Sequence, residues 1–497
     1  MRHKKGTGFT TTPNELHSAE SKMRMTVEKP DENNKMSLIF LMACFIGMTS
    51  GFLIGYMTGV IGGMIFGTGY GNQFFSYAYK NDLDVYAMIT SFVPAALYFY
   101  GSFGIAMRNR EFRRLDMRRH MVLSGALVSM GSVVTVLATS EYVCQLGPNV
   151  FALGFGIMYQ GAQVYMCEMG FAHRNYLGSL SVAFKMMIAV GIFVANLVNC
   201  CTNGIEGGWG WKVSIGIAAI PAATISVGAY LLPDTPIRKT AASTPPFHGT
   251  NDNDVYVLLK DLFAAHEASK SAKGCDVMSQ TQNRPYCLTA IALPLFQQLT
   301  GMNVMVMYAP YLFQVIGFRT GAALTYTAVI GAVNVAATVI GLISVSRGCR
   351  RSFLIAGGVQ LCLGGTAAYD YFIIATTCIC VSGFAWSWGP LGWMFLSSDD
   401  ILLFYPSEVR SCGQNLASKV HWIVSSFMTF VFPFVFRLYK LYVLYLFTFF
   451  VVVMTLLAYY FMPDTNQILV EEDVSRVWKQ HWFWRRYFVD LDDDLMV

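Results

Sequence analysis

The sequence predicts an all-α integral membrane protein, and three observations lead to this fold class. Hydrophobic residues make up 54% of the 497 residues, charged residues make up 13%, and the mean hydropathy is +0.45. Soluble domains carry about 25% charged residues. Apolar stretches that match the length of a membrane-crossing helix, about 20 residues, recur along the chain. These observations argue against a soluble globular domain.

About twelve apolar stretches follow one another, and a long polar segment divides them six and six. The expected spans of the first half are 37–63, 85–107, 119–139, 143–166, 178–200 and 211–232. Those of the second half are 286–313, 323–345, 352–369, 371–396, 413–436 and 441–462. The expected domains are a tail at 1–35, a six-helix half at 36–232, a connector with short helices at 233–284, a second six-helix half at 285–463 and a tail at 464–497.

Basic residues gather in two of the connections between spans. The second connection holds Arg108, Arg110, Arg113, Arg114, Arg118 and Arg119, and the eighth holds Arg347, Arg350 and Arg351. Cytoplasmic connections carry the excess of Lys and Arg, so both tails and the central connector are expected on the cytoplasmic side. The two clusters occupy equivalent places in the two halves, and such an internal repeat is typical of transporters.

Other classes of function find little support in the residues. The net charge of +5 is modest and the basic residues lie in membrane-edge loops, so we expect no nucleic-acid partner. The 12 cysteines are scattered without a CxxC pair, which argues against a zinc site or a disulfide framework. Because no Ser/His/Asp, metal or phosphate-binding constellation is present, we expect no metal, no cofactor and no enzyme activity.

The stretch "PLFQQLTGMNVMVMYAP" at 294–310 is unusually polar for a membrane span. It contains Gln297, Gln298 and Asn303 around Gly301, and Asn334 follows in the next span. A buried amide without a partner costs about 2–7 kcal/mol, so these groups must face something that forms hydrogen bonds. One interpretation is hydrogen bonding between helices. The other is an interrupted helix that lines a wet cavity and binds a neutral polyol, whose hydroxyls both donate and accept.

Three tryptophans in "FAWSWGPLGWMF" offer flat apolar faces for a sugar ring and indole N–H groups for its edge. They are Trp386, Trp388 and Trp393. The alternative is that they mark a membrane interface. Gly and Pro between them would break the helix near the middle of the membrane, where a binding site is expected.

These residues resemble the plant sugar transport proteins, monosaccharide/proton symporters of the sugar porter branch of the major facilitator superfamily. The matching stretches are "EMGFAHR", "VGIFVANLVN", "LLPDTP", "LPLFQQLTGMNVMVMYAP", "SRGCRR", "FAWSWGPLGW", "YPSEVRSCGQ", "FMPDT" and "VWKQHWFW". They occur in family order from about residue 45 to 485. The resemblance implies twelve helices in two six-helix halves, alternating access, a hexose such as glucose as substrate, and a monomer in the plasma membrane. It places Gln297, Gln298, Asn303, Asn334 and Trp393 at positions that bind sugar.

The resemblance also implies a set of charges at the cytoplasmic helix ends that latch the two halves together. They are Arg118, Arg119, Glu168, Arg174, Arg347, Arg350, Arg351, Glu408 and Arg410. The family's glycines before the two arginine clusters are replaced by Met117 and Cys349, and a small insertion makes Arg174 only an approximate equivalent. The alternative is a solvated basic loop that only sets orientation.

The chain departs from the family at the site of proton coupling. The family's aspartate position in the first helix holds Met57, and its arginine position in the fourth helix holds Pro148. Removing one member of a buried ion pair is costly, whereas replacing both can be nearly neutral, so a paired loss is physically coherent. Because Met57 cannot carry a proton, the family's coupling chemistry is expected to be absent here.

Two sugar positions and the extracellular lid also differ from the family. Lys185 and His421 stand where the family has a glutamine and an asparagine. An ionisable residue inside a membrane marks a functional site by default, although Lys185 could instead extend to the cytoplasmic edge. Tyr79 and Arg437 occupy the positions of the family's paired lid cysteines, so a looser lid is expected.

Two classes of function therefore compete. The first is a transporter whose partners are a monosaccharide, protons in the family mechanism, and the lipid bilayer. It either equilibrates sugar by facilitated diffusion, or couples to protons through Lys185 or His421, which can titrate in the useful range. A lysine in the site could also favour an anionic sugar acid. The second class is a sugar sensor or an inactive copy that binds sugar without transporting it.

Overall fold

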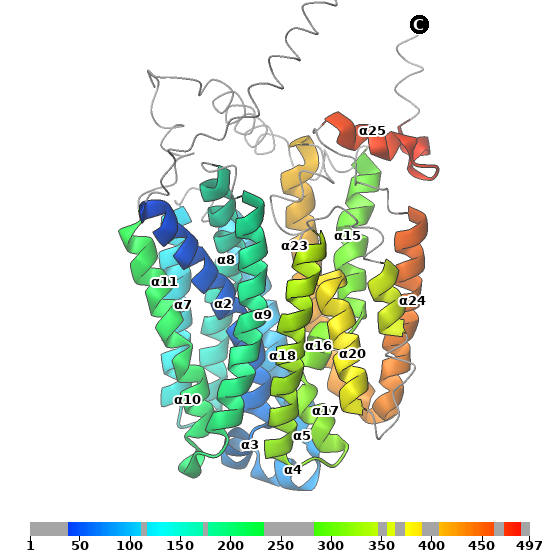
Figure 1. Cartoon of the computed structure of the whole chain (residues 1–497). Helices are drawn as coiled ribbons and strands as arrows, with labels where there is room; N and C mark the ends of the chain where they lie inside the picture. Colours follow the sequence, from blue (N-terminus) through cyan, green and yellow to red (C-terminus); the bar gives the residue numbers. More distant parts are fainter. Residues whose placement is uncertain are drawn as a thin grey trace, which may run out of the picture. The chain divides into compact units, whose positions relative to one another are not determined.

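The computed structural model describes residues 38–110, 117–171, 177–232, 283–345, 355–362, 373–389, 407–461 and 472–488. Met42–Val497 forms one compact unit, and Met1–Leu41 is a separate unit of which the structure describes only 38–41, the start of the first helix. The regular elements of the described ranges are α-helices and 3₁₀ helices, which run side by side as a bundle within the larger unit (Figure 1).

The first half of the chain contributes eleven described helical elements. They are α2 (Leu38–Phe66), α3 (Thr68–Phe74), α4 (Ser76–Asn81), α5 (Leu83–Thr90), α6 (Phe92–Arg110), α7 (Met117–Leu137), α8 (Glu141–Phe171), α9 (Leu177–Thr202), η3 (Glu206–Gly208), α10 (Gly210–Ile217) and α11 (Ala219–Leu231). The expected second span is divided between α5 and α6, and the sixth between α10 and α11. The short helices α3 and α4 form the connection between the first two spans.

The second half contributes ten named elements and a further helical stretch at 355–362. They are α15 (Arg284–Leu299), α16 (Met302–Met307), α17 (Ala309–Val315), α18 (Thr320–Val345), α20 (Ile373–Trp386), α23 (Ser407–Tyr439), η6 (Lys440–Tyr442), α24 (Val443–Phe461), α25 (Glu472–Gln480) and η7 (Trp484–Tyr487).

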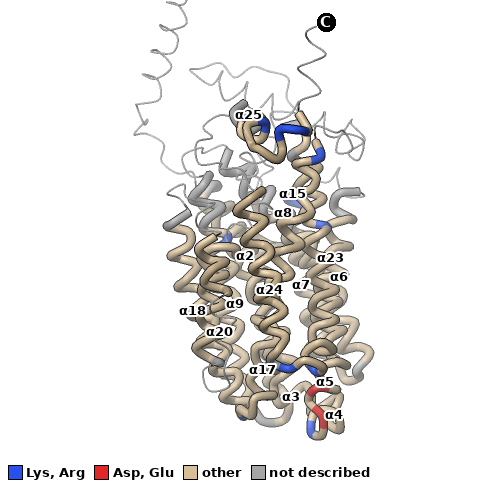
Figure 2. The backbone as a smooth tube through the Cα atoms, turned by 90° about the vertical axis from the view of Figure 1, so that its right-hand side faces the viewer, with Lys and Arg blue, Asp and Glu red and all other residues tan. Residues whose placement is uncertain are grey.

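Among the described residues, nine helices are long and apolar enough to cross a membrane, and Ile374–Trp386 is a shorter apolar helix. The expected span 143–166 lies within α8, and most of the expected span 352–369 lies outside the described residues. Figure 2 shows few charged residues along the middle of the helices, as the low dielectric of a bilayer core requires.

The polar seventh span is interrupted, as its sequence predicts. Helix α15 ends at Leu299, α16 begins at Met302, and Gly301 between them has φ of +73°. This left-handed backbone favours glycine, and a Cβ at this position would lie 2.4 Å from the ring of Phe447. The break redirects the chain at the point where Asn303 follows the two glutamines.

The two halves meet along two pairs of helices. Helix α9 packs against α18, and α6 packs against α23. The amide Nδ2 of Asn196 in α9 donates to the backbone oxygen of Thr327 in α18 at 3.3 Å, and Oγ of Ser426 in α23 donates to the oxygen of Ala95 in α6 at 2.9 Å. The candidate site lies between these contacts.

Candidate functional site

A cavity of about 120 Å³ lies between the two halves. Helices α2, α6, α8 and α9 line it from the first half, and α16, α18, α20 and α23 line it from the second half. Its polar and aromatic lining residues are Thr58, Tyr98, Phe155, Tyr159, Lys185, Asn303, Asn334, Thr338, Phe384, His421 and Trp422. We call this space the central cavity. It brings together Lys185, Asn303, Asn334 and His421, four of the residues selected from the sequence.

Gln298 connects two of the cavity residues. Its Nε2 lies 2.9 Å from Nδ1 of His421, and its Oε1 accepts a hydrogen bond of 3.1 Å from Nδ2 of Asn303. Because an amide Nε2 is a donor, Nδ1 of His421 accepts in this arrangement. Gln298 is 1% exposed, so the pair is held in a fixed geometry at the cavity wall. The network orients the amide of Asn303 and the ring of His421 for a ligand.

Gln297 presents a buried amide whose hydrogen bonds remain open. It is 1% exposed, and neither its Oε1 nor its Nε2 has a partner among the described residues. An unsatisfied buried polar group costs about 1–3 kcal/mol. Such a group is therefore retained at a cost to folding stability, which is expected where a ligand or water supplies the missing partners.

Lys185 brings a cationic group to the wall of the central cavity. It lies in α9 and is 9% exposed, and the neighbouring Ile188 and Ala189 also line the cavity. A lysine that extended to the membrane edge would leave its ammonium group in water, whereas this side chain is buried at the cavity. The functional role of Lys185 stays a prediction.

Trp422 is the principal aromatic residue that sequence reasoning missed. It is 1% exposed, and its ring makes edge contacts with Tyr98, Phe155 and Tyr159 at centroid distances of 5.7, 5.3 and 5.0 Å. Its Nε1 has no acceptor among the described residues. A Cβ at Gly101 would lie 2.1 Å from the indole, so glycine is needed there to admit the ring. Trp422 directly follows the predicted site residue His421, and this adjacency could have identified it from the sequence.

The tryptophans selected from the sequence lie elsewhere. The Nε1 of Trp386 donates to Oε1 of Gln360 at 2.7 Å, and Trp388 is 2% exposed in a separate apolar pocket beside Trp478 and Trp484. Neither belongs to the lining of the central cavity, so the expectation that they supply flat faces for a sugar is wrong within the described structure. Trp393 lies outside the described residues.

The two positions of the missing ion pair are buried. Met57 in α2 is 0% exposed, while its neighbours Ile54 and Thr58 line the central cavity. Pro148 is buried inside α8, where Gly147 next to it packs against α7 with no room for a Cβ beside Thr135. Neither side chain is exposed to solvent, so a charge at either position would not be hydrated.

The expected latch charges are described only in part. The Arg118 guanidinium donates to the backbone oxygen of Tyr230 in α11 and stacks on its ring at 5.1 Å, and Arg119 is exposed. Arg174, Arg347, Arg350 and Arg351 lie outside the described residues, as do the side chains of Glu168, Glu408 and Arg410. The partner that is seen for Arg118 lies within its own half.

The opposite end of the bundle is closed by polar contacts between the halves. Asp84 accepts a hydrogen bond from Tyr311 Oη at 2.7 Å and pairs with Lys440 at 2.5 Å. Arg437 lies 3.7 Å from Asp82. These contacts join α5 and the residue before it to α17, α23 and η6, so they hold the two halves together at this end of the bundle.

Tyr79 lies in the same closed end. Its hydroxyl is 3.5 Å from Oγ1 of Thr320 in α18. Burial raises the pKa of the Tyr79 phenol, so it stays neutral at physiological pH. The two positions expected to hold lid cysteines in the family thus contribute a hydroxyl contact and an ion pair instead.

Comparison with known proteins adds a family assignment to this geometry. A family model described as "Sugar (and other) transporter" matches residues 43–478. Sugar carrier protein C of Ricinus communis is 36% identical over 454 residues, covering 85% of this chain and 83% of its own length. Sugar transport protein MST6 of Oryza sativa subsp. japonica is 34% identical over 501 residues, 93% of each chain. Sugar transport protein 1 of Arabidopsis thaliana is 34% identical over 446 residues, 84% of this chain and 82% of its own.

Solved structures share the architecture at lower identity. The proton:xylose symporter XylE bound to 6-bromo-6-deoxy-D-glucose has a TM-score of 0.70 at 20% identity, covering 88% of this chain and 99% of the other. The inward open conformation of XylE from E. coli has a TM-score of 0.69 at 19% identity, with 88% and 100% covered. At this identity the likeness shows the fold alone, and the fold is that of the major facilitator superfamily, as the sequence predicts.

Proposed function

This chain belongs to the sugar (and other) transporter family, a family of transporters rather than enzymes, and from that premise we propose that it carries a hexose such as glucose through the central cavity. It is a multi-pass integral membrane protein. The family match confirms the resemblance to sugar transporters that the sequence indicated. The relatives named above are called sugar carriers and sugar transport proteins, which supports a sugar as the substrate.

One observation carries the proposal: open hydrogen-bonding groups surround the central cavity between the halves. Among the lining residues, Asn303 and His421 are bonded to Gln298 behind them, and the Trp422 N–H lacks a partner among the described residues. The unpartnered amide of Gln297, next to Gln298 in the chain, does not itself line the cavity. A sugar hydroxyl both donates and accepts, so it can satisfy an amide and an indole at once. The aromatic walls suit the apolar faces of a pyranose ring.

The contacts between the two halves at the α5 end of the bundle support an alternating-access mechanism. Asp82, Asp84 and their partners close one end of the bundle, so the sugar would enter or leave through the other end in this conformation. Rocking of the six-helix halves about the bound sugar would break these contacts and expose the cavity on the closed side. The contacts to be broken at this end include the exposed Arg437–Asp82 ion pair, which contributes about 0–1 kcal/mol, and the hydrogen bond between Tyr311 and Asp84.

The coupling mechanism is proposed to be facilitated diffusion. Met57 and Pro148 stand where the family has its proton-linked charges, and both are buried away from water. Symport uses the membrane potential, which supplies about 2.3 kcal/mol per 100 mV for each charge moved. A methionine cannot bind a proton, so it cannot couple sugar movement to this potential. The alternative is relocated coupling, which the position of Lys185 and His421 in the cavity favours. XylE, which shares the fold, is a proton:xylose symporter.

The deciding experiment is uptake of labelled glucose by cells that lack their own hexose carriers, with and without a protonophore. Equilibration that the protonophore leaves unchanged supports facilitated diffusion. Accumulation that the protonophore abolishes would show relocated coupling, and Lys185→Gln and His421→Asn would then identify the group. Absence of uptake by protein shown to reach the surface would contradict hexose transport and support the sugar sensor or inactive copy instead.

The placement in the cell is part of the same proposal. We expect a monomer in the plasma membrane with both termini in the cytoplasm, because the basic connections lie on that side by the positive-inside rule. The domain limits are part of the proposal as well: the two six-helix halves are expected at 36–232 and 285–463. Labelling of an epitope at each terminus in intact and permeabilised cells tests the orientation, and staining of intact cells would contradict it.

A further inference from the structure

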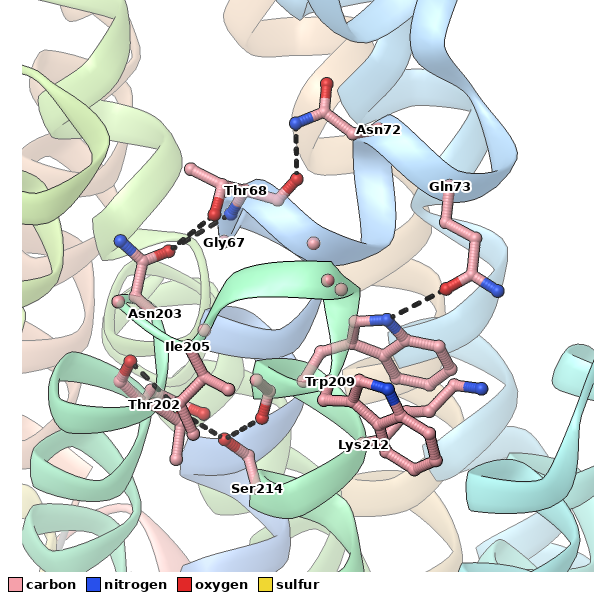
Figure 3. A pocket seen from close by; sticks show the side chains of 18 residues that line it. Gly67, Thr68, Asn72, Gln73, Thr202, Asn203, Ile205, Trp209, Lys212 and Ser214 are labelled. Carbon is pink, nitrogen blue, oxygen red and sulfur yellow. Dashed lines mark hydrogen bonds between the residues drawn. The ribbon is translucent and has the colours of Figure 1, made fainter.

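A second and larger pocket lies at the end of the bundle where α9 gives way to η3 and α10. Its volume is about 600 Å³, and all of its lining residues come from the first half of the chain. One wall is α3 and the end of α2, and the other is the connection from Thr202 to Ser214 (Figure 3). None of the residues that line the central cavity lines this space. We call it the end pocket.

Amide side chains present open hydrogen-bonding groups to the end pocket. Asn203 Oδ1 accepts from the backbone N of Thr68 at 3.1 Å and from its hydroxyl at 3.2 Å, which leaves Nδ2 of Asn203 available. Gln73 Oε1 accepts from Nε1 of Trp211 at 3.3 Å, which leaves Nε2 of Gln73 available. Asn72 donates to the oxygen of Thr68 at 2.7 Å and keeps its own Oδ1 as an acceptor. Figure 3 shows these groups on opposite sides of the pocket.

Asn199 supplies an independent observation at the floor of the end pocket. It is 3% exposed and lines the pocket, and its Oδ1 has no partner among the described residues. Its Nδ2 is held by the backbone oxygens of Gly59 and Val60, both at 3.3 Å. The amide is thus fixed from one side, and its buried acceptor is left without a donor among the described residues beside the pocket. A buried acceptor of this kind points to a ligand hydroxyl or amide.

Trp209 provides an aromatic face at the mouth of the end pocket. It is 58% exposed, and the Lys212 ammonium lies 5.2 Å from its ring centre and 5.5 Å from that of Trp211. Lys212 also donates to the backbone oxygen of Ala138 at 3.5 Å. Its charge is therefore engaged with two rings and a carbonyl, which disfavours an anion as the main ligand. Gly204 beside it leaves open space, since a Cβ there would meet nothing within 4 Å.

We infer that the end pocket is a second saccharide site, which binds a neutral sugar apart from the central cavity. The combination of donors, acceptors and an exposed indole is what a pyranose needs: hydroxyls for the amides and C–H faces for the ring. The inference extends the proposed function, because it assumes that the sugar handled at both sites is the same. The end pocket would hold the sugar near one mouth of the transport path.

The test measures tritiated glucose bound at saturation to the purified full chain in lipid nanodiscs. The wild type is expected to bind two glucose molecules per chain. Gly204→Leu fills the end pocket and should remove one of them. Gly321→Leu is the matched control, because Gly321 also has nothing within 4 Å of a Cβ and does not line the end pocket, so binding should stay at two. Trp209→Ala should weaken the second site at least fivefold, while Tyr142→Ala, at a more exposed aromatic that does not line the end pocket, should not.

Gln298→Ala separates this inference from the proposed function. It should weaken the central site by about 5- to 150-fold, so that this glucose is lost at the concentration that saturates the wild type, and leave the glucose that Gly204→Leu removes. One glucose per chain, lost in Gln298→Ala and kept in Gly204→Leu, would overturn the end site and leave the proposed function intact. One glucose lost only in Gly204→Leu would support the end site and contradict the central one. Competition by glucuronate at the end site better than by glucose would overturn the assignment of a neutral sugar.

Discussion

The two halves of the chain contribute different chemistry to the central cavity. The second half supplies amides and an imidazole, with Gln298 bonded to both Asn303 and His421. The first half supplies Lys185 and the rings of Tyr98, Phe155 and Tyr159, which pack against Trp422 of the second half, and it carries the buried Met57 and Pro148. If the proposed roles hold, recognition of a sugar and coupling to protons depend on different halves, and one can change while the other is kept.

The amides of the second half and the coupling positions of the first half lie on different kinds of backbone. The amides flank a broken helix, whereas Met57 lies in a continuous one. In α15, Gln297 and Gln298 precede the break at Gly301, and Asn303 follows it in α16. Met57 sits in the continuous helix α2 and is fully buried, so loss of a charge there leaves the packing intact. Losing both charges of a pair avoids an uncompensated charge, whereas losing one amide of the network would leave its partners unsatisfied.

The strongest test returns a charge to the first half. Met57→Asp places a carboxylate in a fully buried position, and an uncompensated buried charge costs about 3–5 kcal/mol. We expect a large fall in the apparent melting temperature of the purified protein, measured by intrinsic fluorescence. Met57→Leu, which conserves volume, should cost under about 1.5 kcal/mol.

The double variant Met57→Asp, Pro148→Arg tests whether the two positions form a pair. A double-mutant cycle should show recovery of part of the lost stability if the two side chains meet. Full additivity of the two losses would contradict the pairing and hence the assignment of both positions. Proton-dependent accumulation of glucose by the double variant would show that coupling can be restored without any change to the second half.

The second half is tested by Gln298→Ala. The change leaves His421 and Asn303 without their partner, and an unsatisfied group costs about 1–3 kcal/mol, or roughly 5- to 150-fold in affinity. We expect the apparent KM for glucose to rise by about that factor. Gln360→Ala is the matched control, because Gln360 bonds to Trp386 and Ser382 outside the central cavity. An equal effect of both variants would indicate a general packing defect.

Gln297→Leu distinguishes a ligand-binding amide from a merely buried one. The side chain is 1% exposed and neither amide atom has a partner among the described residues, so an apolar replacement of similar size should leave the melting temperature unchanged or raise it. If the amide binds sugar, the KM for glucose should still rise about tenfold. A more stable protein with an unchanged KM would remove Gln297 from the site.

Much of the second half could be predicted from the sequence, because its signals are local. Three amides around a glycine indicate a broken polar helix, and the structure shows the break at Gly301. The resemblance to the family located Asn334 and His421, which line the central cavity together with Lys185 of the first half. The all-α membrane class followed from hydropathy and length, whereas the major facilitator fold was implied by the resemblance.

The aromatic walls could not be predicted, because they depend on how helices rotate against one another. Trp386 and Trp388 lie near the expected break, yet the first bonds to Gln360 and the second packs in another pocket. Trp422 reaches the cavity because Gly101 of α6 admits its ring. The pairing of Arg437 with Asp82 likewise joins residues far apart in the chain.

Trp422→Phe tests the place where the two halves meet, and its expected effect is the smallest. Phenylalanine keeps an aromatic ring among Tyr98, Phe155 and Tyr159 but removes the N–H, whose hydrogen bond is worth about 0.5–1.5 kcal/mol. We expect the KM for glucose to rise about two- to tenfold with protein abundance unchanged. Gly101→Ala should have a comparable effect by displacing the ring, since its Cβ would lie 2.1 Å from the indole. If Trp422→Phe leaves KM unchanged while Gly101→Ala raises it, the indole acts as a wall of the cavity and the hydrogen bonds to the sugar come from the amides of the second half.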